Sequence, residues 1–142
     1  MRYCIKNIYF PVMTDWSKIV SGDELVSAAK ERATTFLTKK VSSEIASIDI
    51  ANGWSEIKRN KTGRTVSLKK DKKSSDIFEN KIWMIFYKMG FTHMNIDNSF
   101  TLDLNGNSKQ IDIIAMDDET CLFIECKSSK ILDKTTTFKL EL

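Results

Sequence analysis

The chain has 142 residues and a net charge of +3, with 42% hydrophobic and 29% charged residues. That length fits one domain, or one domain with a small appendage, and the composition excludes a largely disordered chain. The longest apolar run, Ile82 to Tyr87, is far shorter than the about 20 residues that span a bilayer. Three cysteines without a paired metal-binding spacing and the lack of a secretory hydrophobic region lead us to expect a cytoplasmic protein without membrane contact.

The first part of the sequence predicts a small N-terminal α/β appendage. Residues 2–10 have the pattern of a strand. Ser21 and Glu24 have the spacing of a capping box, and the apolar residues that follow recur at three- and four-residue intervals. This pattern predicts a helix from Gly22 to about Lys40. A short piece with alternating apolar residues, Ile45 to Ile50, comes next and leads into a turn.

A strongly basic segment follows the appendage. Between residues 58 and 73 there is a single acid, Asp71, against eight basic residues, so the segment has a net charge of +7. The basic residues are Lys58, Arg59, Lys61, Arg64, Lys69, Lys70, Lys72 and Lys73. We expect a basic linker at 58–74 between the appendage, 1–57, and a second domain, 75–142. Such a run is typical of surfaces that bind a nucleic-acid backbone, and a solvated linker without a ligand is the alternative.

The second domain is predicted to contain one helix and three strands. Ser74, Ser75 and Asp76 can cap a helix over about 77–89, and Gly90 is suited to the position just past its end. Three strand patterns joined by tight turns follow, at 99–104, 110–116 and 121–127. The expected fold class is α+β, with the helix followed by a three-stranded meander and covering the sheet.

The last two predicted strands bring two carboxylates together. A hairpin loop of either two or four residues gives the same register, which sets Asp112 opposite Glu125 with Cβ atoms about 4.5–5.5 Å apart. Gln110 and Lys127 fall on the same face, because side chains alternate along a strand. Gln110 is a candidate for binding a phosphate or a water. The neighbouring apolar residues are expected on the other face, in a core: Ile111, Ile113, Leu122, Ile124 and Cys126.

This face has the composition of a metal site. Two opposed carboxylates repel each other, and Lys127 compensates only one of them, so we expect a divalent cation. Mg²⁺, or alternatively Mn²⁺, suits a site with few carboxylates that leaves several waters in place, and the backbone carbonyl of Cys126 is a further candidate ligand. The metal would activate a water and bind a scissile phosphate, while Lys127 would stabilise the developing negative charge. The alternative is a solvent-facing strand pair with a partial salt bridge to Lys127.

The pattern resembles the PD-(D/E)XK nuclease superfamily. Glu79 in the predicted helix, Asp112 in the second strand and Glu125-Cys126-Lys127 in the third match its motif, and one helix with three strands matches the order of its core. The resemblance covers about 75–129. It implies that the Asp and the Glu bind Mg²⁺, that the Lys assists the attacking water, and that Glu79 completes the metal environment. The arrangement is similar to restriction-endonuclease-like modules of prokaryotic phage-defence proteins.

The resemblance implies a Mg²⁺-dependent endonuclease that hydrolyses phosphodiester bonds, with double-stranded DNA as the expected partner. The competing class is a catalytically inactive nuclease-fold module that binds nucleic acid or acts in assembly. Residues 128–142 are too few for the further helix and strand of the superfamily core at full length. This leaves open a longer parent protein, a degenerate copy or a homodimer. Glu79 also has an alternative role at the helix start, because Asp76 and Glu79 have capping-box spacing.

Overall fold

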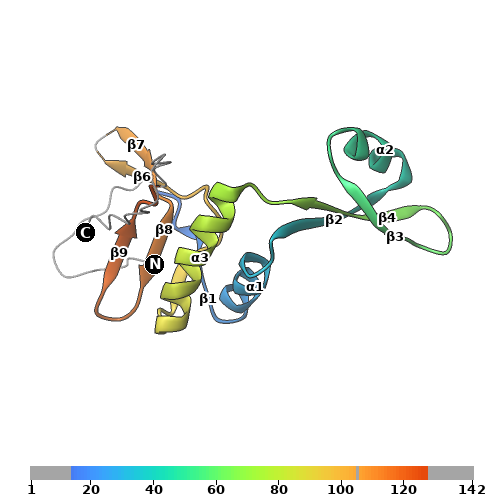
Figure 1. Ribbon diagram of the computed structural model, residues 1–142. Coiled ribbons are helices and arrows are strands. Elements are labelled where there is room, and N and C mark those ends of the chain that lie inside the picture. Colours follow the sequence, from blue (N-terminus) through green and yellow to red (C-terminus); the bar gives the residue numbers. More distant parts are fainter. Residues whose placement is uncertain (1–13, 105, 128–142) are drawn as a thin grey trace, which may run out of the picture. The chain divides into compact units, whose positions relative to one another are not determined.

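The computed structural model describes residues 14–104 and 106–127, so the strand predicted at 2–10 lies outside the described residues. The fold class is α+β, as predicted, with three α-helices and several antiparallel sheets among these residues (Figure 1). No helix within the described ranges has the length and apolar character needed to cross a membrane. The chain forms two compact units, one made of the residues up to 33 together with those from 78 onward, and the other of residues 34–77.

Within the described residues, the first unit is built on a four-stranded antiparallel sheet with the order β1-β5-β8-β9. These strands are β1 (Ile19–Ser21), β5 (His93–Asn95), β8 (Ile113–Met116) and β9 (Cys121–Ile124). The helices α1 (Gly22–Arg32) and α3 (Ser74–Met89, in this unit from Phe78) pack on one face of the sheet. The fully buried Trp83 of α3 lies in this core, beside Ile113 and Ala115 of β8.

The opposite face of the same sheet is covered by a hairpin and a short helix. The hairpin consists of β6 (Thr101–Leu104) and β7 (Asn107–Gln110), and the 3-10 helix η1 spans Trp16–Lys18. Phe100 packs here with Ile114 and Met116 of β8, and its ring centroid lies 5.6 Å from that of Trp16. Both faces of β8 are therefore buried, which explains why all four of its residues are hydrophobic.

The second unit is a three-stranded antiparallel sheet with one helix. Its strand order is β2-β4-β3, and its elements are β2 (Phe36–Ser42), α2 (Ser43–Ala51), β3 (Ser55–Arg59) and β4 (Thr65–Asp71). Ala46 of α2 packs on the fully buried Val66 and Leu68 of β4, with Trp54 partly buried against them. The turn between α2 and β3 requires Gly53, whose φ of +89° is strained for a residue with a Cβ.

The first predicted helix is shorter than expected. It ends at Arg32 rather than near Lys40, because the residues from Phe36 to Ser42 pair with β4 as a strand. Thr35 sits at this break, where its carbonyl accepts a hydrogen bond from the Lys72 N–H at 2.9 Å. The β-branched threonines before the strand favour this extended path, and the pairing with β4 outweighs the helical apolar pattern.

Two further expectations for this part of the chain differ from the structure. The piece from Ile45 to Ile50 belongs to the helix α2, and the Ser42 hydroxyl caps that helix by accepting from the Ile45 N–H at 3.5 Å. Residues 58–74 are not a linker, because they contain the end of β3, a turn and all of β4. The boundary predicted there therefore falls inside the second unit, whose sheet needs strands from both sides of the turn.

The predicted helix at 77–89 is confirmed as α3, which starts three residues earlier at Ser74. Gly90 follows its last residue with a φ of +96°. Trp83 and Phe86 of α3 are buried, whereas Ile85 and Met89 are exposed, so only part of the apolar surface of this helix packs within its unit.

The three predicted strands of the second domain exist, but they do not form one meander. The chain bends at Asp112, so the single strand expected at 110–116 becomes the end of β7 and the whole of β8. The bend also interrupts the alternation of side chains. Ile111 therefore packs with Ile114 and Met116 on the hairpin side, and not with Ile113 on the helix side as expected.

Candidate active site

The β8–β9 hairpin has the predicted register. Ile113 pairs with Ile124 and Met116 with Cys121, which places Asp112 and Glu125 one position beyond the last pair. The Asp112 Oδ2 atom accepts a hydrogen bond from the Cys126 N–H at 2.7 Å. The two chain segments therefore stay close beyond the ends of the strands, at the point where the sequence places its candidate site.

Asp112 is held in position from inside the core by Asn95. Asn95 is fully buried at the end of β5, and its Nδ2 donates to the Asp112 carbonyl at 2.9 Å. Its Oδ1 accepts from the Ile114 N–H, also at 2.9 Å. One side chain thus satisfies backbone groups on both sides of the bend. Its own carbonyl accepts from the Trp83 Nε1–H at 3.0 Å, which connects the bend to α3.

The main partner of Glu125 is Lys109, a residue outside the predicted site. The Lys109 Nζ atom of β7 lies 2.6 Å from Glu125 Oε1. This hydrogen bond and charge lower the pKa of the Glu125 carboxyl, and Lys127 contributes less. Lys127 itself is exposed. The expectation that Lys127 is the sole protein cation beside the two carboxylates, and compensates only one of them, is therefore wrong, because the hairpin β6–β7 supplies Lys109 as a second cation.

Glu79 lies on α3 near Cys126. Its Oε2 accepts a hydrogen bond from the Asn98 side-chain amide. Because α3 begins at Ser74, Glu79 is too far along the helix to act in a capping box, and that alternative is wrong. Burial raises the pKa of the Cys126 thiol to about 12, with further contributions from the negative charges of Asp112 and Glu79. Both carboxylates are thus close enough to act on the same thiol.

A buried arginine completes the surroundings of Glu79. Arg32, the last residue of α1, donates to Asn80 Oδ1 at 2.8 Å and to the Ile96 carbonyl at 3.3 Å, and its guanidinium lies 4.7 Å from the Trp83 ring centroid. Burial lowers its pKa to about 10, an effect that the charges of Asp97 and Glu79 partly oppose. Nothing in the sequence distinguished this residue, because a basic side chain in the last turn of a helix is ordinary.

The remaining predicted site residues fall into two places. Gln110 is exposed on β7, and its side-chain amide donates to the Asn98 carbonyl, so it supports the loop that also contacts Glu79. The eight basic residues predicted to bind nucleic acid all belong to the second unit. Lys58 and Arg59 lie on β3, Lys61 and Arg64 in the following turn, Lys69 and Lys70 on β4, and Lys72 and Lys73 just after it.

The oxygen atoms at the hairpin end are of the type that Mg²⁺ prefers. No group of three His, Cys, Asp or Glu side chains suited to a metal ion occurs within 14–104 and 106–127. The predicted ligands are two carboxylates and one carbonyl, which would leave the other positions to water, as is usual for Mg²⁺. Asp112 uses its Oδ2 toward the Cys126 N–H, and Glu125 is only partly buried. A hydrated cation bound by these residues would have to compete with Lys109 for Glu125.

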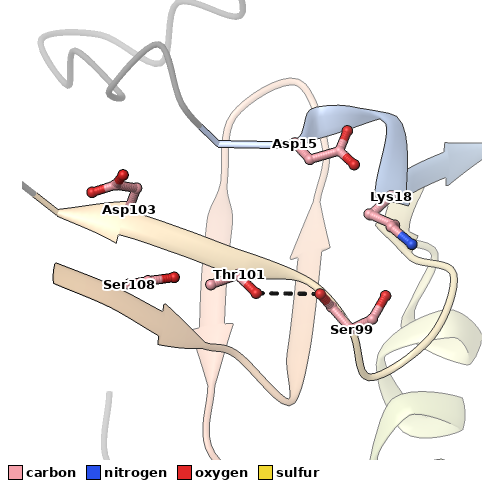
Figure 2. Close-up of a pocket in the computed structure, with 6 residues that line it drawn as sticks. All are labelled: Asp15, Lys18, Ser99, Thr101, Asp103 and Ser108. Atoms are coloured by element: carbon pink, nitrogen blue, oxygen red, sulfur yellow. Dashed lines mark hydrogen bonds between the residues drawn. The ribbon is translucent and has the colours of Figure 1, made fainter. Parts of the chain in front are cut away.

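A separate polar pocket of about 300 Å³ lies between η1 and the β6–β7 hairpin (Figure 2). Its lining consists of Asp15, Lys18, Ser99, Thr101, Asp103 and Ser108. The Asp15 carboxylate accepts from both the backbone N–H and the hydroxyl of Ser17, and these bonds lower its pKa. The Thr101 hydroxyl donates to the Ser99 carbonyl at 3.3 Å. Several of the polar groups that line this pocket are thus already hydrogen-bonded to neighbouring residues.

Comparison with protein-family models, curated proteins and solved structures finds no match for this chain. The candidate site is therefore defined by its own geometry. Asp112, Cys126 and Glu79 lie together, Glu125 is opposite Asp112 in the hairpin register, and Lys127 follows in the exposed chain.

Proposed function

We propose that this chain is a metal-dependent endonuclease of the PD-(D/E)XK type that hydrolyses phosphodiester bonds in DNA. The main support is the end of the β8–β9 hairpin, where Asp112 occupies a bend fixed by a buried side chain and Glu125 lies opposite it. Along the chain α3 is followed by β5, the β6–β7 hairpin, β8 and β9, and the antiparallel pairing of β5 with β8 and of β8 with β9 supports the proposal of a restriction-endonuclease-like core.

Each residue has a distinct role in this proposal. Asp112, Glu125 and the Cys126 carbonyl would hold Mg²⁺, which would lower the pKa of a bound water and bind oxygens of the scissile phosphate. The exposed Lys127 stabilises negative charge on the phosphate as it develops. Glu79 adds negative charge on the α3 side and is itself oriented by Asn98. Asn95 positions Asp112 without touching the substrate.

One observation favours a second candidate function. Glu125 is already neutralised by Lys109, so the hairpin end is electrostatically compensated without a metal. A nuclease-fold module without hydrolytic activity would bind nucleic acid or assemble with other proteins. Such a module would not need to break the ion pair between Lys109 and Glu125. The two functions differ in their response to divalent cations.

Plasmid cleavage by the chain in the presence of Mg²⁺ or Mn²⁺ tests the proposal. We expect the wild type to nick the plasmid and Asp112→Asn to lose this activity, because it removes a ligand charge while keeping the shape of the side chain. Asp118→Asn is the matched control, since it removes an exposed carboxylate from the turn of the same hairpin. Thermal melting is measured in parallel, and Mg²⁺ should raise the melting temperature of the wild type only when Asp112 is present. A wild type without metal-dependent cleavage or stabilisation would contradict the nuclease proposal and favour the binding module.

A further inference from the structure

The sheet of the second unit has two faces with different chemistry. Val66 and Leu68 of β4 are fully buried on the side of α2. Side chains alternate along a strand, so Thr65, Ser67 and Lys69 lie on the opposite face. We call that side the open face; it consists of these residues and their partners in β2 and β3.

The strand register extends the open face into two neighbouring rows. Ser67 pairs with a lysine on each side, and Lys69 pairs with a hydroxyl residue on each side. The rows are Lys40–Ser67–Lys58 and Thr38–Lys69–Ser55. A bulge at Ile57 shifts the register of β3 and keeps Ser55 and Lys58 on the same face. Three lysines therefore alternate with three hydroxyl groups across this surface.

The basic residues on the α2 side already have partners within the unit. Lys39 Nζ lies 2.6 Å from Asp49 Oδ1 and 4.3 Å from the Trp54 ring centroid. Arg59 pairs with Glu56 at 2.8 Å, and Lys70 donates to the Asn52 carbonyl at 2.9 Å. Lys39 connects the sheet to the helix α2, Lys70 connects it to the turn after α2, and Arg59 pairs with a residue of its own strand.

The open-face lysines have no such role. Lys40, Lys58 and Lys69 are exposed, and within the described residues none of them has a hydrogen-bond or ion-pair partner. The acid nearest to them on this face is Asp71, at the end of β4. Adjacent strands are about 4.8 Å apart, so the three lysines start from backbone positions within about 10 Å of one another. Such a cluster of like charges suits a polyanion better than a single carboxylate.

We propose that the open face binds the phosphate backbone of duplex DNA. Lys40, Lys58 and Lys69 contact phosphates, and the hydroxyl groups of Thr38, Ser55 and Ser67 donate hydrogen bonds to them. Lysine, serine and threonine are common phosphate contacts, which position a protein on DNA without reading its sequence. The aromatic residue on this face, Phe36, lies at its end and is 39% exposed, so the two rows offer no aromatic stack for single-stranded bases.

This inference revises the set of residues expected from the basic segment. Lys40 joins the surface although it lies outside residues 58–73, whereas Arg59 and Lys70 leave it because they serve the fold. The choice of DNA rests on the proposed function. Binding, however, requires neither the metal nor Asp112, and can therefore be measured separately.

The test measures binding of the intact chain to a short fluorescent DNA duplex by anisotropy, in EDTA and over a range of salt concentrations. The first variant carries Lys40→Gln, Lys58→Gln and Lys69→Gln. The control carries Lys30→Gln, Lys81→Gln and Lys88→Gln, three exposed lysines of α1 and α3. Both variants lose the same charge, and unchanged circular dichroism and melting temperature confirm that both are folded.

We expect the open-face variant to bind much more weakly and with a flatter salt dependence. Each lost phosphate contact removes about 0.9 from the slope of log affinity against log salt, so the slope should fall by about two to three. The control should change the slope by less than about one. Equal losses in the two variants would show that only net charge matters, and an unaffected open-face variant would show that the face does not bind DNA. Either result overturns the inference.

Two further measurements distinguish DNA binding by the open face from binding at the hairpin end and from binding to lipid. Asp112→Asn should bind the duplex with the same salt dependence as the wild type. If the wild type binds DNA through the three lysines but does not cleave it, the result supports the open face and contradicts only the nuclease proposal. Vesicles containing phosphatidylserine are the second probe. If the three lysines matter more for vesicle binding than for duplex binding, the face is a membrane-binding surface and the inference is wrong.

Discussion

The two units of this protein use polar side chains in opposite ways. In the first unit, Arg32, Asn80 and Asn95 are each less than a tenth exposed, and Arg32 and Asn95 bond across several elements. In the second unit, the lysines of the open face are exposed and have no partner among residues 14–104 and 106–127. Buried polar groups fix geometry because leaving them unsatisfied is costly, whereas exposed charges contribute mainly long-range attraction. Substitutions should therefore change stability in the first unit and salt-dependent binding in the second.

The largest expected effect concerns Asn95. Replacement by Leu removes the partners of the buried Ile114 N–H and of the partly buried carbonyls of Asp112 and Asp97. Each of these three unsatisfied groups costs about 1–3 kcal/mol, so we expect the free energy of unfolding to fall by about 3 kcal/mol or more. Urea denaturation measures this loss. Asn107→Leu on the exposed strand β7 is the control, and a loss no larger than that of the control would break the contrast between buried and exposed polar groups.

A smaller effect is expected at the Cys126 thiol, whose pKa is about 12 in the folded chain and 9.0 ordinarily. In the pH range between these values the folded chain keeps a proton that the unfolded chain releases, so this thiol makes stability fall as pH rises from 9 to 12. Asp112→Asn removes a negative charge that disfavours the thiolate. We expect it to speed alkylation of Cys126 by iodoacetamide several-fold near pH 10, because only the thiolate reacts.

This alkylation experiment uses a chain in which Cys4 and Cys121 are replaced by Ala, so that a single thiol reacts. Asp118→Asn in the same background is the control, because that carboxylate lies in the exposed turn. Equal rates in the two variants would mean that Asp112 does not act on the thiol. The proposed grouping of Asp112, Glu79 and Cys126 would then be wrong.

The smallest expected effect concerns the ion pair of Lys109 and Glu125, which is more exposed than the contacts of the buried Arg32 and Asn95. Lys109→Gln should raise the pKa of Glu125 toward its ordinary value and leave the melting temperature almost unchanged, because exposed pairs contribute little to stability. If Glu125 binds the cation, its release from Lys109 should increase Mn²⁺ affinity a few-fold in calorimetric titration. Lys88→Gln is the control, and an affinity equal to that of the control would exclude Glu125 as a ligand.

Local patterns predicted the parts of the fold that depend on neighbouring residues. The register of β8 and β9 follows from a short turn, because the pairing of Ile113 with Ile124 holds for either loop length. Helix α3 and its end at Gly90 follow from local sequence, although Ser74, Ser75 and Asp76, predicted to cap the helix, belong to its first turn. By contrast, β2 was mistaken for the end of a helix, because its identity depends on pairing with β4 from Phe36↔Asp71 to Ser42↔Thr65.

In the candidate site, too, local features could be predicted from the sequence and contacts between distant segments could not. The carboxylates Asp112 and Glu125 could be identified from the sequence because one hairpin carries both. Their partners could not, since Lys109 belongs to a different hairpin and Asn95 to a strand on the other side of β8. The sequence around Asn95 does not distinguish it from an ordinary loop residue. Its role in fixing the bend at Asp112 follows from its burial and its hydrogen bonds in the folded chain.

The division of the chain between the units has a consequence for the order in which the protein folds. Residues 34–77 interrupt the first unit, whose strands β1 and β5 pair Ile19 with Asn95. The second unit contains all of its own sheet partners, so it can fold during synthesis before β5 has left the ribosome. Its folding brings Thr34 and Lys72 together, with Lys72 Nζ donating to the Thr34 carbonyl at 2.9 Å, and so shortens the loop that the first unit must close. The DNA-binding surface that we propose would therefore form before the carboxylates of the β8–β9 hairpin are brought together, so a nascent chain could bind DNA before the proposed nuclease site exists.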